Sequence, residues 1–563
     1  MGGNMAYAQV IPDAGTLLQQ QQNLDRLPPT PLEEPQLEEK PPIKPPATDQ
    51  VTVFVHTFKI RGETTAFSHK RLLALLDNYI NTHLSISDLQ QAANIITNFY
   101  QQHGYFLARA YLPKQDVTDG IVTIAIQEGL LESDDCILIN GNNLRLRPDY
   151  TKRIIDNALP PNQPLKQQQL ERGLLLLNDL PGITANANLK QGASPGTTRI
   201  ELNLAEASLF NSNLRYDNYG SRYTGSKRAT VNVNLNNLTG FGDQFALSGT
   251  KASNGDYNYI NLNYAIPLGV SGLRGAINYS YLNYGIGKEL KVLDAKGDAK
   301  TWNVNLRYPL IRTRKQSLYL TGSYDRKDFY NESFGTETSD KQLDIATIGL
   351  NLKHNDRIWG GGYTLANFSI SSGELDLSNN AINLAQDQSA IGPNTQGDFQ
   401  KLSWSATRVQ YGTNRLILVG SLHGQFASKN LDSSEKFQLG GPTGVRAYPN
   451  SEATGDDGVR ATLEAYYQLG FHPVFGSFNV QTFYDWGRIR RFHNDRNLNL
   501  TTKNSYSLSG YGIGISVNKA NKYDVRLQWA HKIGSNPLAD PQGNDSDGKD
   551  DKSRVWLSFS AYF

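Results

Sequence analysis

Apolar and polar residues alternate along the chain over residues 209–563. In the segments ATVNVNLNNL (229–238) and YNYINLNYAI (257–266), one face of an extended strand is apolar and the other is rich in asparagine. A β-sandwich would also alternate, but its outer faces would be charged. The observed faces favour a barrel with lipid outside and water inside. Glycines alternate in GYGIGIS (510–516), where we expect them to relieve crowding within the barrel rather than to bind a nucleotide.

Seven short segments have the composition of turns: 239–243, 267–272, 309–316, 354–361, 411–414, 472–477 and 518–522. Long loops lie at 376–398, 428–458 and 534–551. This pattern predicts eight hairpins, and therefore a transmembrane β-barrel of 16 antiparallel strands over residues 208–563. Each strand would have roughly 10 residues, or about 22 with its connection. The last strand ends with Phe559 and Phe563 on its apolar face, and we expect these two residues to signal insertion of the barrel.

Residues 51–207 contain the same succession of elements twice. The first copy begins with one alternating strand, VTVFVHTFKI (51–60), and continues through two helix-like segments to two strand-like segments. The second copy repeats that order. Each copy predicts a β-α-α-β-β unit, with bounds at 51–130 and 131–207. Neither copy carries a nucleophile elbow, a metal-spaced set of Cys and His, or a phosphate-binding loop.

The first fifty residues divide into three parts. An Ala-Tyr-Ala segment before Gln9 has the small-x-small pattern that precedes signal-peptidase cleavage, so residues 1–8 are interpreted as a signal-peptide remnant, with a chance match as the alternative. Residues 9–27 contain an aspartate before a run of Leu and Gln, which predicts one capped helix. Residues 28–50 are rich in proline and predict an extended, semi-rigid linker.

Composition excludes some classes of protein and leaves others open. The net charge of +2, from 55 basic and 53 acidic residues, provides no field that would recruit nucleic acid. No run of about 18 apolar residues exists, so a membrane-spanning helix is not expected. The single cysteine, Cys136, excludes an intrachain disulfide, which fits either a reducing compartment or an envelope protein that folds without cross-links.

The segment GGPTGVRAYPNSEATGDDG (440–458) places one long cation, Arg446, among glycines, prolines and small polar residues. A turn-rich connection of this kind is solvated by default. A barrel of sixteen strands, however, encloses a wide aqueous lumen, and the loop 428–458 is long enough to fold into it. In the strand that contains FYDWG, alternation turns Phe483 and Asp485 toward the lumen. Asp485 is then the natural bidentate partner of Arg446.

Two of these motifs resemble those of the two-partner secretion transporters (TpsB type) of the outer-membrane insertase superfamily. The family's Val-Arg-Gly-Tyr loop is matched, together with the proline that follows it, by Val445, Arg446, Ala447, Tyr448 and Pro449. Its aromatic-x-Asp strand motif is matched by Phe483 and Asp485. Ala447 departs from the commoner glycine, but this version looks like that of hemolysin, adhesin and contact-dependent-inhibition exporters. The resemblance covers nearly all of the chain after the signal region.

The resemblance implies an outer-membrane protein of a Gram-negative bacterium, with a plug helix at 9–27, two periplasmic POTRA domains at 51–130 and 131–207, and the barrel. It implies a transporter rather than an enzyme, without cofactor or metal. The POTRA domains would capture the N-terminal secretion domain of a large secreted exoprotein, which would leave unfolded through the barrel without ATP and fold outside into a β-helix. The other expected partners are outer-membrane lipid and the barrel assembly machinery; we expect a monomer that binds no nucleic acid.

Two other classes of protein stay open at this point. The first is an assembly factor or insertase for other membrane proteins, which usually carries more POTRA repeats and no plug helix. The second is a passive pore or surface adhesin, in which two periplasmic repeats would have no purpose. A large neighbouring reading frame for a secreted protein would support secretion, and its absence would favour assembly.

Overall fold

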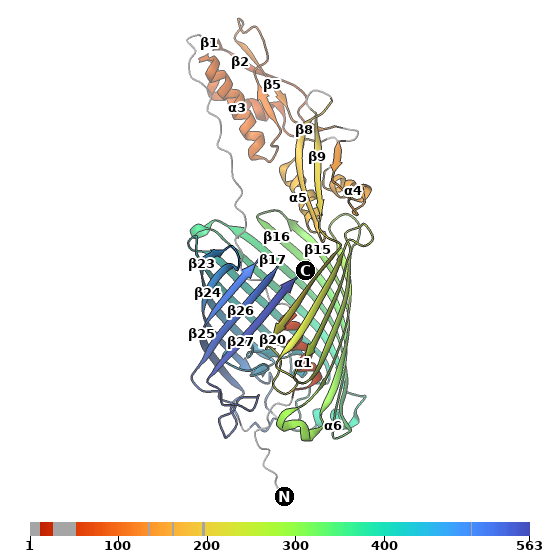
Figure 1. Cartoon of the computed structure of the whole chain (residues 1–563). Helices are drawn as coiled ribbons and strands as arrows, with labels where there is room; N and C mark the ends of the chain where they lie inside the picture. The colour runs from red at the N-terminus through yellow and green to blue at the C-terminus, as the bar shows by residue number, and fades with distance from the viewer. Residues whose placement is uncertain are drawn as a thin grey trace.

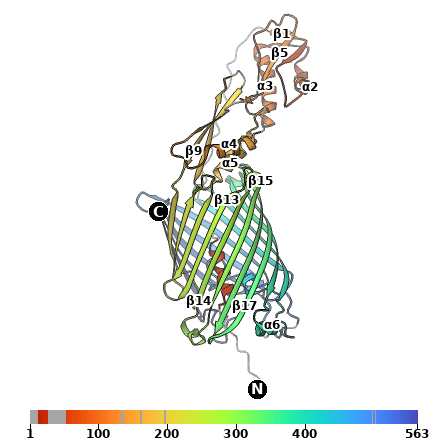
Figure 2. The ribbon, with the colours of Figure 1, turned by 90° about the vertical axis from the view of Figure 1, so that its right-hand side faces the viewer.

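The computed structural model describes residues 12–25, 52–132, 136–159, 163–193, 197–496, 498–500 and 502–563. It contains a closed barrel with two small α/β units stacked on one end (Figure 1). One helix lies inside the barrel in both ribbon views (Figures 1 and 2). The signal remnant expected at 1–8 and the linker expected at 28–50 lie outside the described residues. None of the described helices is long and apolar enough to cross a membrane.

The first α/β unit is built from β1 (Thr52–Val55), β2 (Thr57–Arg61), α2 (His69–Leu73), the 3₁₀ helix η1 (Ala74–Tyr79), β3 (Thr82–Ser85), α3 (Ile86–Gln102), β4 (Arg109–Tyr111) and β5 (Ile121–Gln127). β5 is central in its sheet, parallel to β2 and antiparallel to β4. The prediction of one strand over 51–60 is wrong. His56 interrupts it by donating its backbone N–H to the Gly120 carbonyl, and β1 pairs with β3 instead.

The second α/β unit contains β6 (Leu130–Leu131), β7 (Ile137–Asn140), α4 (Pro148–Ala158), α5 (Gln167–Asn178), β8 (Ile183–Gln191) and β9 (Thr197–Glu206). β9 is parallel to β7 and antiparallel to β8, which repeats the topology of the first unit. Asp179, just after α5, joins this unit to the barrel. Its carboxylate accepts hydrogen bonds from Arg312 Nε (2.8 Å) and Nη2 (2.7 Å) and from the hydroxyl of Tyr319 (3.2 Å).

Sixteen strands close the barrel: β10 (Phe210–Asp217), β11 (Arg228–Asn236), β12 (Gln244–Ala252), β13 (Asp256–Pro267), β14 (Arg274–Gly285), β15 (Lys296–Arg312), β16 (Gln316–Ser333), β17 (Thr336–Asp356), β18 (Gly362–Asp376), β19 (Gly397–Tyr411), β20 (Leu416–Ala427), β23 (Asp457–His472), β24 (Gly476–Arg490), β25 (Ser505–Lys519), β26 (Tyr523–Ile533) and β27 (Ser553–Tyr562). Each is antiparallel to its neighbours, and β27 pairs with β10, so the barrel has no free edge. The predicted 16-stranded barrel is confirmed.

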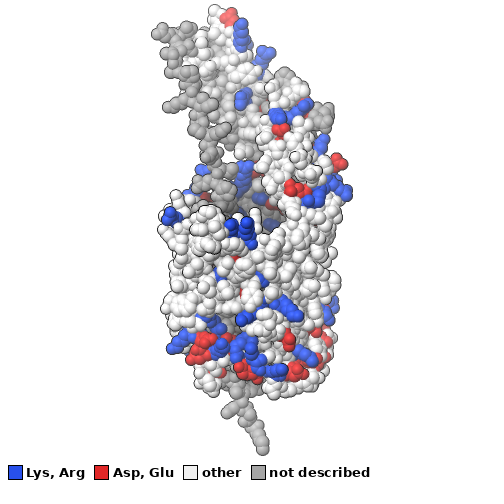
Figure 3. Space-filling view, in the orientation of Figure 1, with Lys and Arg blue, Asp and Glu red and all other residues white. Residues whose placement is uncertain are grey.

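The outer face of the barrel is apolar along its middle. Ile277 and Ile348 are 55% and 68% exposed on this face, as the alternation predicts. The expected strand length of roughly 10 residues is wrong for β15, β16 and β17, which have 17, 18 and 21 residues. These strands continue beyond the apolar band to exposed charged residues such as Lys300 and Arg326. Figure 3 shows charged side chains gathered at the end of the barrel remote from the α/β units.

The helix inside the barrel is α1 (Ala14–Asp25), where one capped helix is predicted. Asp13 caps it, because its Oδ1 accepts the backbone N–H of Thr16 at 2.7 Å. Leu17 and Leu18 pack against inward side chains of the barrel. The long connections contain further short elements: η2 (Lys288–Leu293), α6 (Ala381–Asp387), η4 (Ser433–Glu435), β21 (Phe437–Gln438) and β22 (Thr454–Gly455). The 3₁₀ helix η3 (Ile358–Gly360) lies in the short turn between β17 and β18.

Candidate functional site in the barrel lumen

The connection between β20 and β23 folds into the lumen. It spans residues 428–456, two residues less than the expected 428–458, because β23 begins at Asp457. β21 and β22 pair with each other and narrow the loop at its base. Its apolar residues pack on inward side chains of β24 and β25 in one buried cluster, which includes Leu439, Val445, Ala447, Tyr448, Phe483, Tyr506 and Leu508. The loop therefore lies against one wall of the barrel instead of in solvent.

Arg446 at the tip of this loop is bound to Asp485 on β24. Its Nε donates to Asp485 Oδ2 at 2.9 Å and its Nη2 to Oδ1 at 2.8 Å, which is a planar two-point fork. The backbone N–H of Arg446 adds a third hydrogen bond to Oδ2 at 3.1 Å. Arg446 is 5% exposed and Asp485 is 0% exposed. The pairing expected from strand alternation is thus present, and both charges are withdrawn from water.

The guanidinium has two further partners. Its Nη1 donates to Glu464 Oε1 on β23 at 2.8 Å, and Gln481 Nε2 donates to the same oxygen at 2.6 Å. The ring of Phe483 lies under the guanidinium, with Cζ of Arg446 3.4 Å from the ring centroid. Phe483 therefore supports the cation from below while two carboxylates hold it from the side. Glu464 was not foreseen from the sequence, although its alternation with Leu463 indicates an inward side chain.

The last strand holds the same loop tip. Nε1 of Trp556 on β27 donates to the Arg446 carbonyl at 2.8 Å. Trp556 also meets the ring of Tyr219 edge-on, with centroids 5.9 Å apart. Trp556 was not foreseen from the sequence, since it lies on the face of this strand opposite to Phe559. Phe559 and Phe563, on that outer face, are 41% and 74% exposed and lie away from the loop.

The remaining residues of the loop motif are buried around Arg446. Val445 is fully buried and donates its N–H to the Leu439 carbonyl at 2.6 Å. Ala447 faces β25, Tyr448 is buried beside Lys532, whose Nζ lies 5.1 Å from the ring centroid, and Pro449 is also buried. The motif therefore packs as one unit.

The helix α1 contacts this loop directly. Ser433 Oγ of the loop donates to Asp13 Oδ2 at 2.6 Å, and Gln19 Nε2 donates to the Lys436 carbonyl at 2.5 Å. On its other side, Gln21 Oε1 accepts from Arg228 Nη1 at 3.1 Å and from the barrel's Tyr257 hydroxyl at 3.0 Å. The helix is therefore held between the loop and the wall by polar contacts at these points, beside the apolar packing of Leu17, Leu18 and Leu24.

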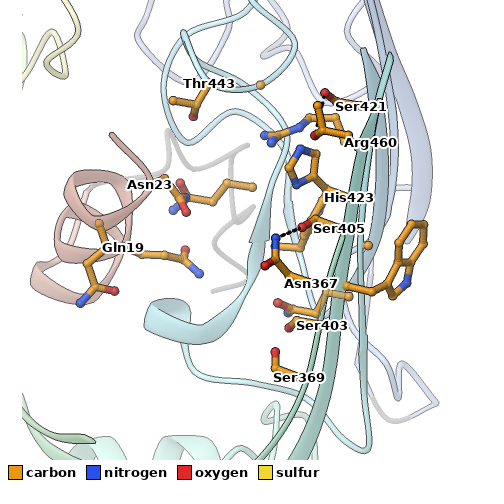
Figure 4. A pocket seen from close by; sticks show the side chains of 18 of the residues that line it. Gln19, Asn23, Asn367, Ser369, Ser403, Ser405, Ser421, His423, Thr443 and Arg460 are labelled. Atoms are coloured by element: carbon orange, nitrogen blue, oxygen red, sulfur yellow. Dashed lines mark hydrogen bonds between the residues drawn. The ribbon is translucent and has the colours of Figure 1, made fainter. Parts of the chain in front are cut away.

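A cavity of about 890 Å³ remains beside the helix and the loop. Figure 4 shows Gln19 and Asn23 of α1 on one side and strand side chains on the other, with Thr443 of the loop between them above. The strand side is lined largely by small hydroxyl and amide groups, among them Asn367, Ser369, Ser403, Ser405 and Ser421. These groups can form hydrogen bonds with water or with a passing chain, and apolar side chains such as Leu365 and Val419 line the cavity beside them.

Comparisons with known proteins agree with this architecture. The family model for haemolysin secretion/activation proteins ShlB/FhaC/HecB matches residues 196–517, and that for ShlB-type POTRA domains matches 53–129. The chain is 28% identical to the heme/hemopexin transporter protein HuxB of Haemophilus influenzae, over 87% of this chain and 84% of that protein. It is 25% identical to the outer membrane transporter CdiB of Dickeya dadantii, over 80% and 79%. The solved structure of CdiB from Escherichia coli superposes with a TM-score of 0.74 at 20% identity, over 99% of this chain and 100% of that one.

Proposed function

Because the chain belongs to the family of haemolysin secretion/activation proteins ShlB/FhaC/HecB, we propose that its lumenal helix and loop form the gate through which one large exoprotein is secreted. The chain is an outer-membrane transporter of two-partner secretion with its POTRA region in the periplasm, and it works with a secreted partner protein. Membership of this family favours secretion over the functions of an assembly factor or a passive pore.

The observation that carries the proposal is the joint occupation of the lumen by α1 and the loop 428–456. Beside their apolar packing, both make polar contacts, and polar groups that leave one another in a wetted lumen can exchange their hydrogen bonds for bonds to water. We propose that residues 9–27 plug the lumen at rest, and that the Arg446–Asp485 fork keeps the loop in place. The channel itself performs no catalytic chemistry.

We further propose how the exoprotein enters. The units at 51–130 and 131–207 act as two POTRA domains that capture its N-terminal secretion domain by adding a strand to a sheet edge, since main-chain pairing tolerates many sequences. The unfolded exoprotein then passes along the cavity beside α1, and its folding outside into a β-helix drives movement outward without ATP. The barrel functions as a monomer, and Phe559 and Phe563 address it to the barrel assembly machinery.

Reconstitution tests the proposal. The purified transporter is inserted into proteoliposomes and supplied with the unfolded secretion domain encoded by the large neighbouring reading frame. We expect the secretion domain to enter the vesicles, where it is protected from added protease, and we expect this uptake to require the periplasmic units. A transporter without them that still moves the exoprotein would refute the proposed capture, and failure of the intact protein to move it would refute the proposed function.

A further inference from the structure

Lumen-facing glycines lie on β23, β24 and β25 directly beneath the loop 428–456. A Cβ atom added to each would come within 3.0 Å of a side chain, a separation that real Cβ atoms essentially never show. The pairs are Gly458 with Phe437 Cδ1 (2.3 Å), Gly487 with Leu439 Cδ2 (2.5 Å), Gly510 with Ala447 Cβ (2.6 Å) and Gly512 with Phe483 Cζ (2.3 Å).

Three of these partners belong to the loop, and the fourth, Phe483, is the ring beneath the Arg446 guanidinium. Added Cβ atoms also meet side chains elsewhere in the barrel, as at Gly373 with Phe399 Cζ (2.6 Å) and Gly424 with Trp404 Cε2 (2.4 Å), but there the partner is on the neighbouring strand and not in the loop. Gly249 on β12 and Gly322 on β16 have nothing within 4 Å of an added Cβ. The close approach of the loop to β23–β25 thus depends on missing side chains at particular positions.

We infer that Gly458, Gly487, Gly510 and Gly512 form a glycine seat, a set of positioning residues that lets the loop lie flat against β23–β25. The seat brings Arg446 within reach of the Asp485 fork and keeps the loop away from the hydroxyl-lined wall of β18–β20. That wall stays open, and the cavity in Figure 4 lies along it. The use of this opening by an exoprotein rests on the proposed function, whereas the seat itself does not.

The pair of Gly510 and Ala447 shows most directly how the seat works. The Ala447 methyl group has no further torsion, so it can move away only with the backbone of the loop. A methyl group at position 510 would therefore displace the loop tip and lengthen the hydrogen bonds of the adjacent Arg446. The same methyl group would lie 2.9 Å from the His531 carbonyl oxygen, which belongs to the wall. Removing the Ala447 methyl group should consequently relieve most of the crowding, but not all of it.

The test measures how well Arg446 is protected in the full-length protein reconstituted in liposomes, and it needs no exoprotein. Phenylglyoxal, a small arginine reagent, modifies Arg446 when its fork opens, and peptide mass spectrometry compares the rate with that at the exposed Arg314. We expect Gly510→Ala to raise the relative rate by about fivefold or more. The double variant Gly510→Ala with Ala447→Gly should return to within about twofold of Ala447→Gly alone.

A second pair makes the rescue specific. Gly487→Ala should also raise the rate, and Leu439→Val should lower it again because it removes the Cδ atoms that the new methyl group meets. Ala447→Gly should not rescue Gly487→Ala, and Leu439→Val should not rescue Gly510→Ala. Gly322→Ala, a strand glycine with open space around it, should behave as wild type.

Unchanged protection of Arg446 in both Gly510→Ala and Gly487→Ala would overturn the seat. Defects that neither partner substitution relieves, or that both relieve equally, would also overturn it, because they would indicate general damage to the strands. Heat-modifiability on gels checks that each barrel is folded. If Gly510→Ala alone does not fold, the double variant with Ala447→Gly decides: a folded double variant supports the seat, and an unfolded one contradicts it. If the glycine variants expose Arg446 as expected but the protein moves no exoprotein, the seat is upheld and only the proposed function is refuted.

Discussion

Replacing Arg446 by alanine should release the loop from the wall and impair secretion. The change removes both guanidinium hydrogen bonds from Asp485, which is 0% exposed, and leaves it the backbone N–H of residue 446 and the charge of Arg460 nearby. Breaking a buried ion pair from one side costs about 3–5 kcal/mol. Glu464 contributes less, because its side chain is 15% exposed and borders the cavity. We therefore take about 3 kcal/mol as the free energy by which Arg446→Ala destabilises the loop on the wall. This lowers the ratio of seated to released loops by about a hundredfold.

The double-mutant cycle with Asp485→Ala tests whether the two residues act together. Each single variant should impair secretion, and the double variant should be less impaired than the sum of the single effects, because neither charge is then left alone. Arg446→Lys should rescue only partly, since an ammonium cannot reproduce the planar fork to Asp485. The charge reversal of Arg446→Asp with Asp485→Arg tests geometry more severely and is not required to succeed.

The assay is secretion of the exoprotein by purified, folded variants in proteoliposomes. Arg408→Ala is a matched control, because Arg408 forms an ion pair with Asp356 whose side chains are 30% and 13% exposed, and such pairs contribute about 0–1 kcal/mol. Strictly additive effects of Arg446→Ala and Asp485→Ala would show that the residues do not couple. Wild-type secretion by Arg446→Ala would show that the fork has no role in the gate.

Three further predictions concern the helix, the two α/β units and their junction with the barrel. Deleting residues 13–26 should raise single-channel conductance and leave the barrel heat-modifiable, and unchanged conductance would show that the helix does not occlude the lumen. Deleting residues 51–130 or 132–206 should abolish secretion without preventing membrane insertion, whereas secretion by a barrel without both would contradict capture by these units. Asp179→Ala should loosen the second unit from the barrel, because it removes three hydrogen bonds. Hydrogen exchange around α5 should increase, and unchanged exchange would show that this carboxylate does not join the two parts.

The sequence predicted the parts of the fold that depend on a period of two. Alternation located the sixteen strands and turned Asp485 inward, and glycine, proline and asparagine marked the turns. Alternation could not show that Glu464 lies beside Arg446. A bulge shifts the register of β23 and β24 between Gln468 and Gly470, so counting back from the turn gives the wrong cross-strand partner.

Other features depend on contacts between distant segments. The break at His56 results from a hydrogen bond to Gly120, and no local pattern in 51–60 indicates it. Trp556 reaches the loop tip from β27, which lies two strands from β25 in the sheet, and no local pattern in that strand indicates this contact. The glycines of 510–516 were expected to relieve crowding, but their partners Ala447 and Phe483 could not be identified before the loop was placed.

The shortness of α1 affects how the channel can close again. The helix has twelve residues, and isolated helices of this length are only marginally stable in water. Once outside the lumen, the segment would therefore unwind, and each closure would couple its refolding to its binding. Helix formation takes about 1 μs or less, so the search of the tethered coil for the barrel mouth sets the closing time. The segment that blocks the channel would then acquire its helical structure only on the barrel's inner surface.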